Sequence, residues 1–197
     1  MSERIDGVEV LECTRCPALC DSRSQIVNGV GTTTPPILFV GEAPGATEDR
    51  KGEPFVGRSG EVLNDALRDR GLARRDVRIT NCVRCRPPDN RDPHTDELAN
   101  CRSHLTREID GVDPEVIVTL GRVPSEHLLE RDVTVTTEAG DVLERRIGGK
   151  SRRIVICVHP AATLYDRSQE ETFTSAIDTA VSLVGGDVGG QARLGDF

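Results

Sequence analysis

The sequence predicts an α/β fold, a three-layer α/β/α sandwich around a central four-stranded parallel sheet. Four short runs rich in β-branched residues alternate with segments of helical period, a pattern typical of a parallel sheet covered on both faces. The first run, I-L-F-V-G at 37–41, is apolar or small at every position, as a strand buried on both sides should be. The other three runs lie at 77–80, 116–120 and 154–158.

A small or polar residue follows each predicted strand. Glu42, Asn81, Gly121 and His159 stand at these four positions. Right-handed crossovers place the carboxyl ends of parallel strands on one edge of the sheet. Ligands of open α/β sheets bind at that edge, so we expect these side chains to converge on a binding site.

The segments between the strands predict the covering helices and loops. Residues 42–57 are polar and glycine-rich and predict a long functional loop. Ser59 is expected to cap a helix that ends near Gly71. Further helices are expected at about 95–109, around Leu128 and Leu129, and at about 170–184. Residues 133–147 alternate about Ala139-Gly140-Asp141 and predict a β-hairpin.

Composition bounds the class of protein. The chain has 197 residues, and we expect one domain over 1–184 and a frayed, glycine-rich tail over 185–197. The net charge of −8 argues against a general nucleic-acid coat protein, which is usually basic. Twenty-three arginines stand against two lysines. Acid excess with few lysines predicts a salt-rich, halophilic host, with GC-rich coding as the alternative explanation.

Location and cysteine usage go together. The polar amino-terminal residues and the absence of a long apolar run predict no signal peptide, no membrane span and a cytoplasmic protein. Seven cysteines, an odd number in a reducing compartment, favour metal or catalytic use over disulfides.

Four cysteines form a candidate metal site. Cys13 and Cys16 make a C-x2-C pair, and Cys85 and Cys101 lie far along the chain, separated by fifteen residues. Four thiolates from distant segments suit a tetrahedral zinc ion or a [4Fe–4S] cluster, and spacing alone leaves both open. A zinc-ribbon pairing through Cys82 is the alternative, although Cys82 directly follows a strand end and is expected to point into the core.

Five motifs in order then carry a resemblance. These are C-x2-C at 13–16, G-E-A-P-G at 41–45 followed by E-D at 48–49, G-E-P-F-V-G-R-S-G at 52–60, T-N-C-V-R-C-R-P-P at 80–88, and H-P-A at 159–161. With them the chain resembles the family 4 uracil-DNA glycosylases, the iron–sulfur type of archaea and thermophilic bacteria. The resemblance covers about residues 13–184.

The resemblance implies an enzyme that flips uracil out of double- or single-stranded DNA and hydrolyses its N-glycosidic bond in base excision repair. It implies a monomer with a structural [4Fe–4S] cluster on Cys13, Cys16, Cys85 and Cys101. A sister group that bonds covalently to uracil carries a histidine near 51–54. This chain has none there, which favours hydrolysis.

The matched motifs assign roles to individual residues. Phe55 would stack on the flipped uracil, Asn81 would read O4 and N3–H, and His159 would donate to O2 of the departing base. Glu42, with the backbone of the neighbouring Gly41 and Ala43, would hold the pocket floor and orient water.

DNA contacts are expected outside the pocket. Leu164, Tyr165 and Arg167 are candidates to enter the gap that the flipped base leaves. Arg122 and Ser125, at a helix start, are candidates for phosphate.

Two rival functions remain open from sequence. One is a same-fold glycosylase or binder for other deaminated bases. The other is a non-enzymatic iron–sulfur DNA-binding protein, against which the intact set of candidate pocket residues argues. A nucleotide-phosphate enzyme would need a G-x-x-x-x-G-K-[ST] loop, which the chain lacks.

Overall fold

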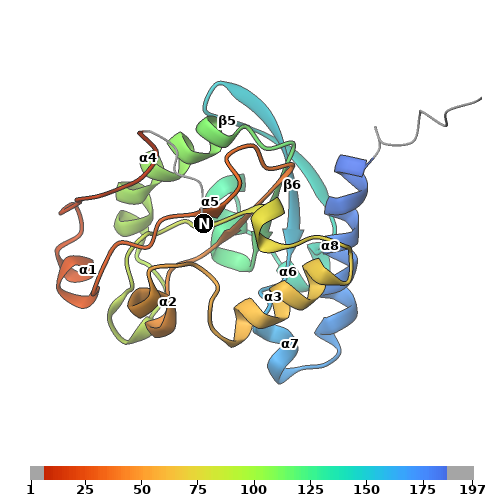
Figure 1. Cartoon of the computed structure of the whole chain (residues 1–197), viewed down its shortest axis with the longest axis horizontal. Helices are drawn as coiled ribbons and strands as arrows, with labels where there is room; N and C mark the ends of the chain where they lie inside the picture. The colour runs from red at the N-terminus through yellow and green to blue at the C-terminus, as the bar shows by residue number, and fades with distance from the viewer. Residues whose placement is uncertain (1–6, 186–197) are drawn as a thin grey trace, which may run out of the picture.

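A six-stranded mixed sheet lies at the centre of the computed structural model, which describes residues 7–185 (Figure 1). The strand order is β1-β3-β2-β4-β6-β5, and the inner four strands are parallel. The predicted α/β class and parallel core are confirmed, but antiparallel β1 and β5 add an edge strand on each side. The bounds are β1 Val30–Gly31, β2 Ile37–Gly41, β3 Arg78–Asn81, β4 Val116–Leu120, β5 Val142–Ile147 and β6 Lys150–Cys157.

Helices cover both faces of the sheet. The cluster of buried side chains that includes α3 and α8 residues lies on one face, and the cluster that includes α4 and α5 residues lies on the other. Of the predicted tail at 185–197, Gly185 is the last residue of α8, and residues 186–197 lie outside the described residues. The helices are α1 Pro17–Ser22, α2 Ala46–Lys51, α3 Arg58–Arg68, α4 Thr95–Val112, α5 Arg122–Leu129, α6 Val135–Glu138, α7 Ala162–Tyr165 and α8 Gln169–Gly185, with 3₁₀ turns η1 Arg74–Asp76 and η2 Pro88–Asn90.

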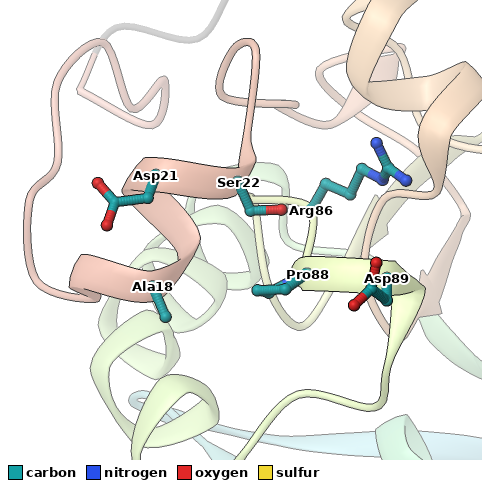
Figure 2. A pocket seen from close by; sticks show the side chains of 6 residues that line it. All are labelled: Ala18, Asp21, Ser22, Arg86, Pro88 and Asp89. Atoms are coloured by element: carbon teal, nitrogen blue, oxygen red, sulfur yellow. The ribbon is translucent and has the colours of Figure 1, made fainter.

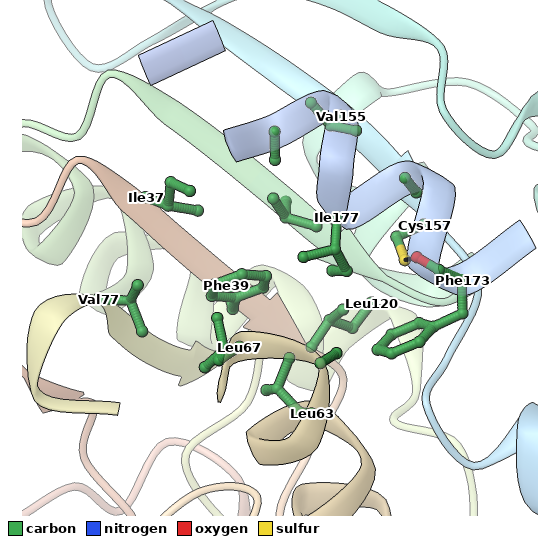
Figure 3. Close-up of a cluster of buried hydrophobic side chains, with 14 of the residues drawn as sticks. Ile37, Phe39, Leu63, Leu67, Val77, Leu120, Val155, Cys157, Phe173 and Ile177 are labelled. Carbon is green, nitrogen blue, oxygen red and sulfur yellow. Dashed lines mark hydrogen bonds between the residues drawn. The ribbon is translucent and has the colours of Figure 1, made fainter. Parts of the chain in front are cut away.

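Strand β2 shows how the sequence builds the two cores. Ile37 and Phe39 pack into the cluster under α3 and α8 (Figure 3), whereas Leu38 and Val40 pack into the cluster under α4. All four side chains are fully buried. The prediction of a strand covered on both faces is therefore confirmed. Burial of each of these side chains contributes about 1.5–3 kcal/mol to the free energy of folding.

Parallel pairing brings the strand ends together. Gly41 of β2 pairs with Asn81 of β3, and Leu120 of β4 pairs with Cys157 of β6. The ladder of β2 and β3 continues past the strands, since the Cys82 amide donates to the Gly41 carbonyl at 2.8 Å. The residues that follow the strands therefore share one edge.

Two local predictions were wrong. The expected hairpin at 133–147 is instead α6 followed by β5, and β5 pairs with β6 across the turn at Gly148 and Gly149. Gly148 has φ +60°, which suits a tight hairpin turn and which the two glycines permit without strain. The sequence offers two glycine turns, and the strands pair at the second.

The long loop at 42–57 is also interrupted. It contains α2, which ends at Gly52 in the left-handed conformation. The next helix, α3, begins one residue before Ser59, with Gly57 as its N-cap and no side-chain cap. Gly52 ends α2 with a left-handed backbone, whereas Gly57, the residue before α3, is extended.

A buried ion triad ties α4 to the sheet. Glu108 accepts from Arg78 Nε at 2.8 Å and also pairs with Arg84, and all three side chains are nearly inaccessible to water. Burial raises the pKa of Glu108 and the two guanidinium groups lower it, with a net fall. The carboxylate therefore stays charged and holds Arg84, which lies in the loop with Cys85.

Candidate active site and cysteine cavity

A small cavity of about 180 Å³ opens at the edge where the parallel strands end. It brings together residues from three strand ends and from the loop around α2, which are far apart in sequence. Ala43, Gly45, Glu48, Phe55, Ser59, Asn81 and His159 line it. Four of the sequence-predicted site residues, Ala43, Phe55, Asn81 and His159, thus share one cavity.

Two glycines at strand ends make the space. A Cβ on Gly41 would lie 2.5 Å from both the Phe55 ring and Asn81 Oδ1, so these two side chains rest against bare backbone. A Cβ on Gly121 would lie 3.3 Å from the Cβ of His159, and Gly121 has φ +107°. Any larger residue at 41 would displace the groups that form the cavity.

Phe55 occupies an unusual backbone conformation. Its φ is +52°, a region that costs a residue other than glycine about 1–2 kcal/mol. Its ring is buried, packs against the core and faces His159, with ring centroids 5.8 Å apart and planes tilted by 33°. The strained residue therefore places its aromatic ring in the lining of the cavity.

The hydrogen bonding of His159 assigns its tautomer. The Ala161 amide donates to Nδ1 of His159 at 3.1 Å, so the neutral ring carries its proton on Nε2. Burial lowers the pKa of His159 to about 4, and the nearby Glu48 carboxylate acts in the opposite direction. At neutral pH the side chain is therefore an uncharged donor.

The Asn81 side chain is buried, and its amide is available to bind a ligand. Only 3% of the residue is exposed. Within the described part of the chain no hydrogen bond engages its side-chain amide. An amide offers one acceptor and two donor hydrogens. Such a buried group discriminates between ligand edges, because a mismatched ligand leaves it unsatisfied.

Two carboxylates near the cavity have different surroundings. Glu42 is half-buried. Burial raises its pKa to about 7, helped by Asp92 and opposed by Arg122. Glu48 lines the cavity, and its Oε1 accepts the amides of Val56 at 3.0 Å and Gly57 at 2.8 Å.

The sequence motifs assign the pocket carboxylate to Glu42, yet Glu48 is the carboxylate on the cavity wall. Sequence reasoning also missed Gly45 and Ser59 as lining residues. The E-D motif at 48–49 pointed to Glu48. The direction of its side chain could not be predicted, because the sequence gives no sign of the short helix α2 that carries it.

The predicted metal ligands share a second cavity. Cys13, Cys16, Cys85 and Cys101 all line it, together with Cys20 and the apolar Leu19 and Val83. They arrive from the segment before α1, the loop after β3 and helix α4. Cys82 and Cys157 are fully buried and do not line this cavity, and Cys82 lies in the apolar core, as expected.

Nitrogen donors point at two of the sulfurs. Arg23 Nη1 donates to Cys85 Sγ at 2.8 Å while its Nη2 holds the Cys13 carbonyl at 2.7 Å. Asn100 Nδ2 donates to Cys16 Sγ at 3.5 Å. Burial raises the pKa of Cys85 to about 11, and Arg23 acts against this rise. N–H donors to sulfur are the means by which proteins stabilise metal-bound thiolates.

The spacing of the thiols bears on what they could hold. Among residues 7–185, no three His, Cys, Asp or Glu side chains meet closely enough to bind a single metal ion. A mononuclear zinc site needs four ligands about 2.0–2.3 Å from one point. In a [4Fe–4S] cluster each thiolate binds a different iron, so thiols spread around a cavity fit that donor set.

Helix α2 connects the two cavities. Asp49 accepts the Ser24 amide at 2.9 Å, and Gln25 Nε2 donates to the Asp49 carbonyl at 2.8 Å. Ser24 and Gln25 follow directly on Arg23, which holds the cysteine segment. The neighbouring Glu48 holds the Phe55 loop, so six residues of helix join both sites.

The groove beside the cysteine cavity is shallow and polar. It has a volume of about 360 Å³ and lies between α1 and η2, with Asp21 and Ser22 on one side and Arg86 and Asp89 on the other (Figure 2). It shows that α1 docks beside the loop after β3 without closing fully over it.

The expected DNA contacts are divided. Leu164 is 37% and Tyr165 is 87% exposed on α7, just after His159, and Arg167 is exposed nearby. Arg122 is exposed but paired with Asp92 and Glu126. Ser125 is fully buried and its hydroxyl bonds to the Gly121 carbonyl at 2.7 Å, so it does not face a phosphate.

His104, on the inner side of α4, is only 7% exposed. None of the helices in the described part of the chain is long and apolar enough to cross a membrane.

Comparison with known proteins gives a consistent result. The model of the uracil DNA glycosylase superfamily matches residues 28–180. A type-4 uracil-DNA glycosylase of Archaeoglobus fulgidus is 39% identical over 93% of this chain and 94% of its own. One of Thermotoga maritima is 41% identical over 82% of each chain. A type-5 uracil-DNA glycosylase of Pyrobaculum aerophilum is 33% identical over 58% of this chain and 63% of its own.

Proposed function

The chain belongs to the type-4 uracil-DNA glycosylases of the uracil DNA glycosylase superfamily, and from this premise we propose that it removes uracil from DNA by hydrolysing the N-glycosidic bond. The observation that carries the proposal is the cavity that joins Phe55, Asn81 and the neutral His159. A base must leave the helix to reach such a cavity, which costs a few kcal/mol.

Recognition falls to Phe55 and Asn81. The Phe55 ring stacks on the flipped base, and the buried Asn81 amide donates to O4 and accepts from N3–H of uracil. Cytosine presents the reverse pattern at these two positions, so an amide held in the orientation that reads uracil would be left unsatisfied. The backbone of Gly41 and Ala43 completes the floor.

Bond cleavage depends on His159. As the bond to the sugar breaks, negative charge collects on the departing uracil. The Ala161 amide donates to Nδ1 of His159, so the proton of the neutral ring lies on Nε2. This Nε2–H can donate to O2 of the departing uracil and stabilise its negative charge. A water then attacks the sugar, and we assign its orientation to Glu42 in its ionised form.

The cysteine cavity belongs to the same proposal. Cys13, Cys16, Cys85 and Cys101 would hold a [4Fe–4S] cluster, with Arg23 and Asn100 donating to its thiolates. When bound, the cluster supplies a cross-link among three segments of the chain. Its readout is independent of catalysis: a brown protein with a broad visible absorbance that chelation and oxidation bleach.

DNA contacts complete the proposal. Exposed Leu164 and Tyr165 fill the gap in the helix, and Arg167 and Arg122 bind phosphate. The enzyme acts as a cytoplasmic monomer on single- or double-stranded DNA. The salt-rich host suggested by the rarity of lysine stays a prediction, and it sets the salt range for assays.

The test is cleavage of a uracil-containing oligonucleotide, followed by alkali, across a range of salt. We expect a strand break at uracil that His159→Ala reduces by about 10²–10³-fold. His127→Ala is the matched control, because His127 is also a partly buried histidine with a pKa lowered to about 4 but lies outside the cavity. Equal losses in both variants would contradict the assigned role, and a hypoxanthine-containing strand tests the rival substrate.

A further inference from the structure

The backbone around Phe55 is held by two side chains rather than by secondary structure. Arg74 Nη2 donates to the Pro54 carbonyl at 2.7 Å and Nη1 donates to the Phe55 carbonyl at 3.0 Å. On the next two residues, Glu48 accepts the amides of Val56 and Gly57. Arg74 thus binds the carbonyls of Pro54 and Phe55, and Glu48 binds the amides of the next two residues.

These contacts act on a residue that needs them. Phe55 has φ +52°, a conformation that a phenylalanine leaves readily when nothing opposes it. Helix α3 presses on the same carbonyl, since a Cβ on Gly60 would lie 1.9 Å from it. Rotation of this peptide would swing the ring away from Gly41 and Asn81, where its edge now rests.

Arg74 acts from outside the cavity. It lies on η1, between α3 and β3, and does not line the cavity. Besides the two carbonyls it donates to Asn64 Oδ1 at 3.1 Å, which fixes its guanidinium on α3. A planar guanidinium can bridge two carbonyls in this way, whereas an ammonium group cannot hold the same fork.

We propose that Arg74 is a positioning residue that holds Phe55 in its left-handed conformation and so sets where the aromatic ring meets the flipped base. This inference rests on the proposed function, in which Phe55 stacks on uracil. Arg74 touches no ligand, so its whole effect on uracil cleavage runs through Phe55.

That dependence gives a sharp test by double-mutant cycle. Arg74→Gln is measured for kcat/KM on uracil-containing DNA in the wild-type chain and in Phe55→Ala. We expect a fall of roughly ten- to a hundredfold in the first background, as for a displaced contact group, and less than twofold in the second. Equal falls in both backgrounds would overturn the proposal. Arg74→Lys is the second variant in case the glutamine variant does not fold. Its kcat/KM in the wild-type chain should lie between that of the wild type and that of Arg74→Gln.

Arg70→Gln is the matched control. Arg70 is also held on two carbonyls, with Nη1 on Ala66 at 2.8 Å and Nη2 on Thr174 at 2.9 Å, and it pairs with Asp178. It joins α3 to α8 without touching the Phe55 loop. Its loss should lower the melting temperature and leave kcat/KM at permissive temperature within twofold of wild type.

A readout without catalysis separates this inference from the proposed function. Hydrogen exchange of the Val56 and Gly57 amides should quicken in Arg74→Gln and stay at the wild-type rate in Arg70→Gln. Unchanged exchange in Arg74→Gln would overturn the positioning role even if the enzyme cleaves uracil. If the wild-type chain cleaves no uracil but the Val56 and Gly57 amides still exchange faster in Arg74→Gln, the proposed function is refuted and the role of Arg74 in holding Phe55 stands.

Discussion

The cavity at the sheet edge and the cavity lined by cysteines are assembled in different ways. Asn81 and His159 come at or just after the ends of β3 and β6, so the hydrogen bonds of the sheet already place them. Cys16, Cys85 and Cys101 come from the start of α1, a loop and the middle of α4, with no common sheet to hold them. The sheet places the residues of the first site, whereas side-chain contacts such as those of Arg23 with Cys85 and the Cys13 carbonyl bring the second together.

This difference in assembly predicts whether a mutation changes activity or stability. A change in the first site should alter chemistry and leave stability alone. A change in the second should alter stability, and reach chemistry only through the contacts of α2. The following variants test whether that separation is real.

The largest effect is expected for Cys85→Ser. The binding free energy of a structural metal centre is folding free energy, on the order of 10 kcal/mol for structural zinc, and losing one thiolate forfeits much of it. The visible absorbance should vanish and the melting temperature should fall steeply. Cys20→Ser is the control, because Cys20 lines the same cavity but bonds the Cys13 carbonyl, a contact that serine can keep. Loss of colour in the control alone would reassign the ligands.

Next comes Glu108→Gln, on the cysteine side of the molecule. Removing the charge takes away the carboxylate that the buried Arg78 and Arg84 share, which should cost about 3–5 kcal/mol in denaturant unfolding. The exposed pair of Glu130 with Arg102 supplies the control, and Glu130→Gln should cost less than about 1 kcal/mol.

The pH dependence of this variant has a defined sign. The pKa of Glu108 is lowered in the fold, so its contribution is present above the ordinary glutamate range and is lost as pH falls through the folded pKa. The stability gap between wild type and Glu108→Gln should therefore narrow in acid. A gap that is constant with pH would contradict an ionised Glu108.

Asn81→Ala should have the opposite signature. We expect kcat/KM for uracil to fall about 10²–10³-fold with the melting temperature nearly unchanged, because the amide makes no hydrogen bond within the described fold. Single-turnover cleavage and a melting curve on the same sample measure both. A large fall in melting temperature would mean that the two sites are not separable.

The smallest effect is a pH profile. The pKa of Glu42 is raised to about 7, so the fraction of ionised carboxylate grows up to that pH. If Glu42 orients the water, the cleavage rate should rise about tenfold per pH unit below 7 and then level off. Glu42→Gln should be slower and lose this slope. His159, with its pKa lowered to about 4, should add no step between pH 5 and 8.

Residues placed by regular structure were the ones that sequence could predict. The apolar runs of β2 and β4 fixed those strands to the residue, and parallel topology then brought Asn81 and His159 together. The α/β class and the membership of the uracil-DNA glycosylases are confirmed by the fold and the comparisons.

What sequence missed depends on short elements and side-chain packing. Helix α2 has six residues between glycines, too few for a periodic signal, and Glu48 is placed by it. The hairpin could turn at Gly140 or at Gly148, and only pairing with β6 decides. Ser125 stands at a helix start, but it turns inward because its hydroxyl finds the Gly121 carbonyl.

The separation of the cysteine pairs along the chain also has a consequence in time. Cys13 and Cys16 leave the ribosome roughly 70 residues before Cys85, and Cys101 follows later still. At ordinary synthesis rates the first two thiols wait roughly 3 to 14 s without their partners. Strand β2, helix α2 and the Phe55 loop all emerge in that interval. The four thiols of the proposed cluster are therefore all present only after much of the uracil site has been synthesised.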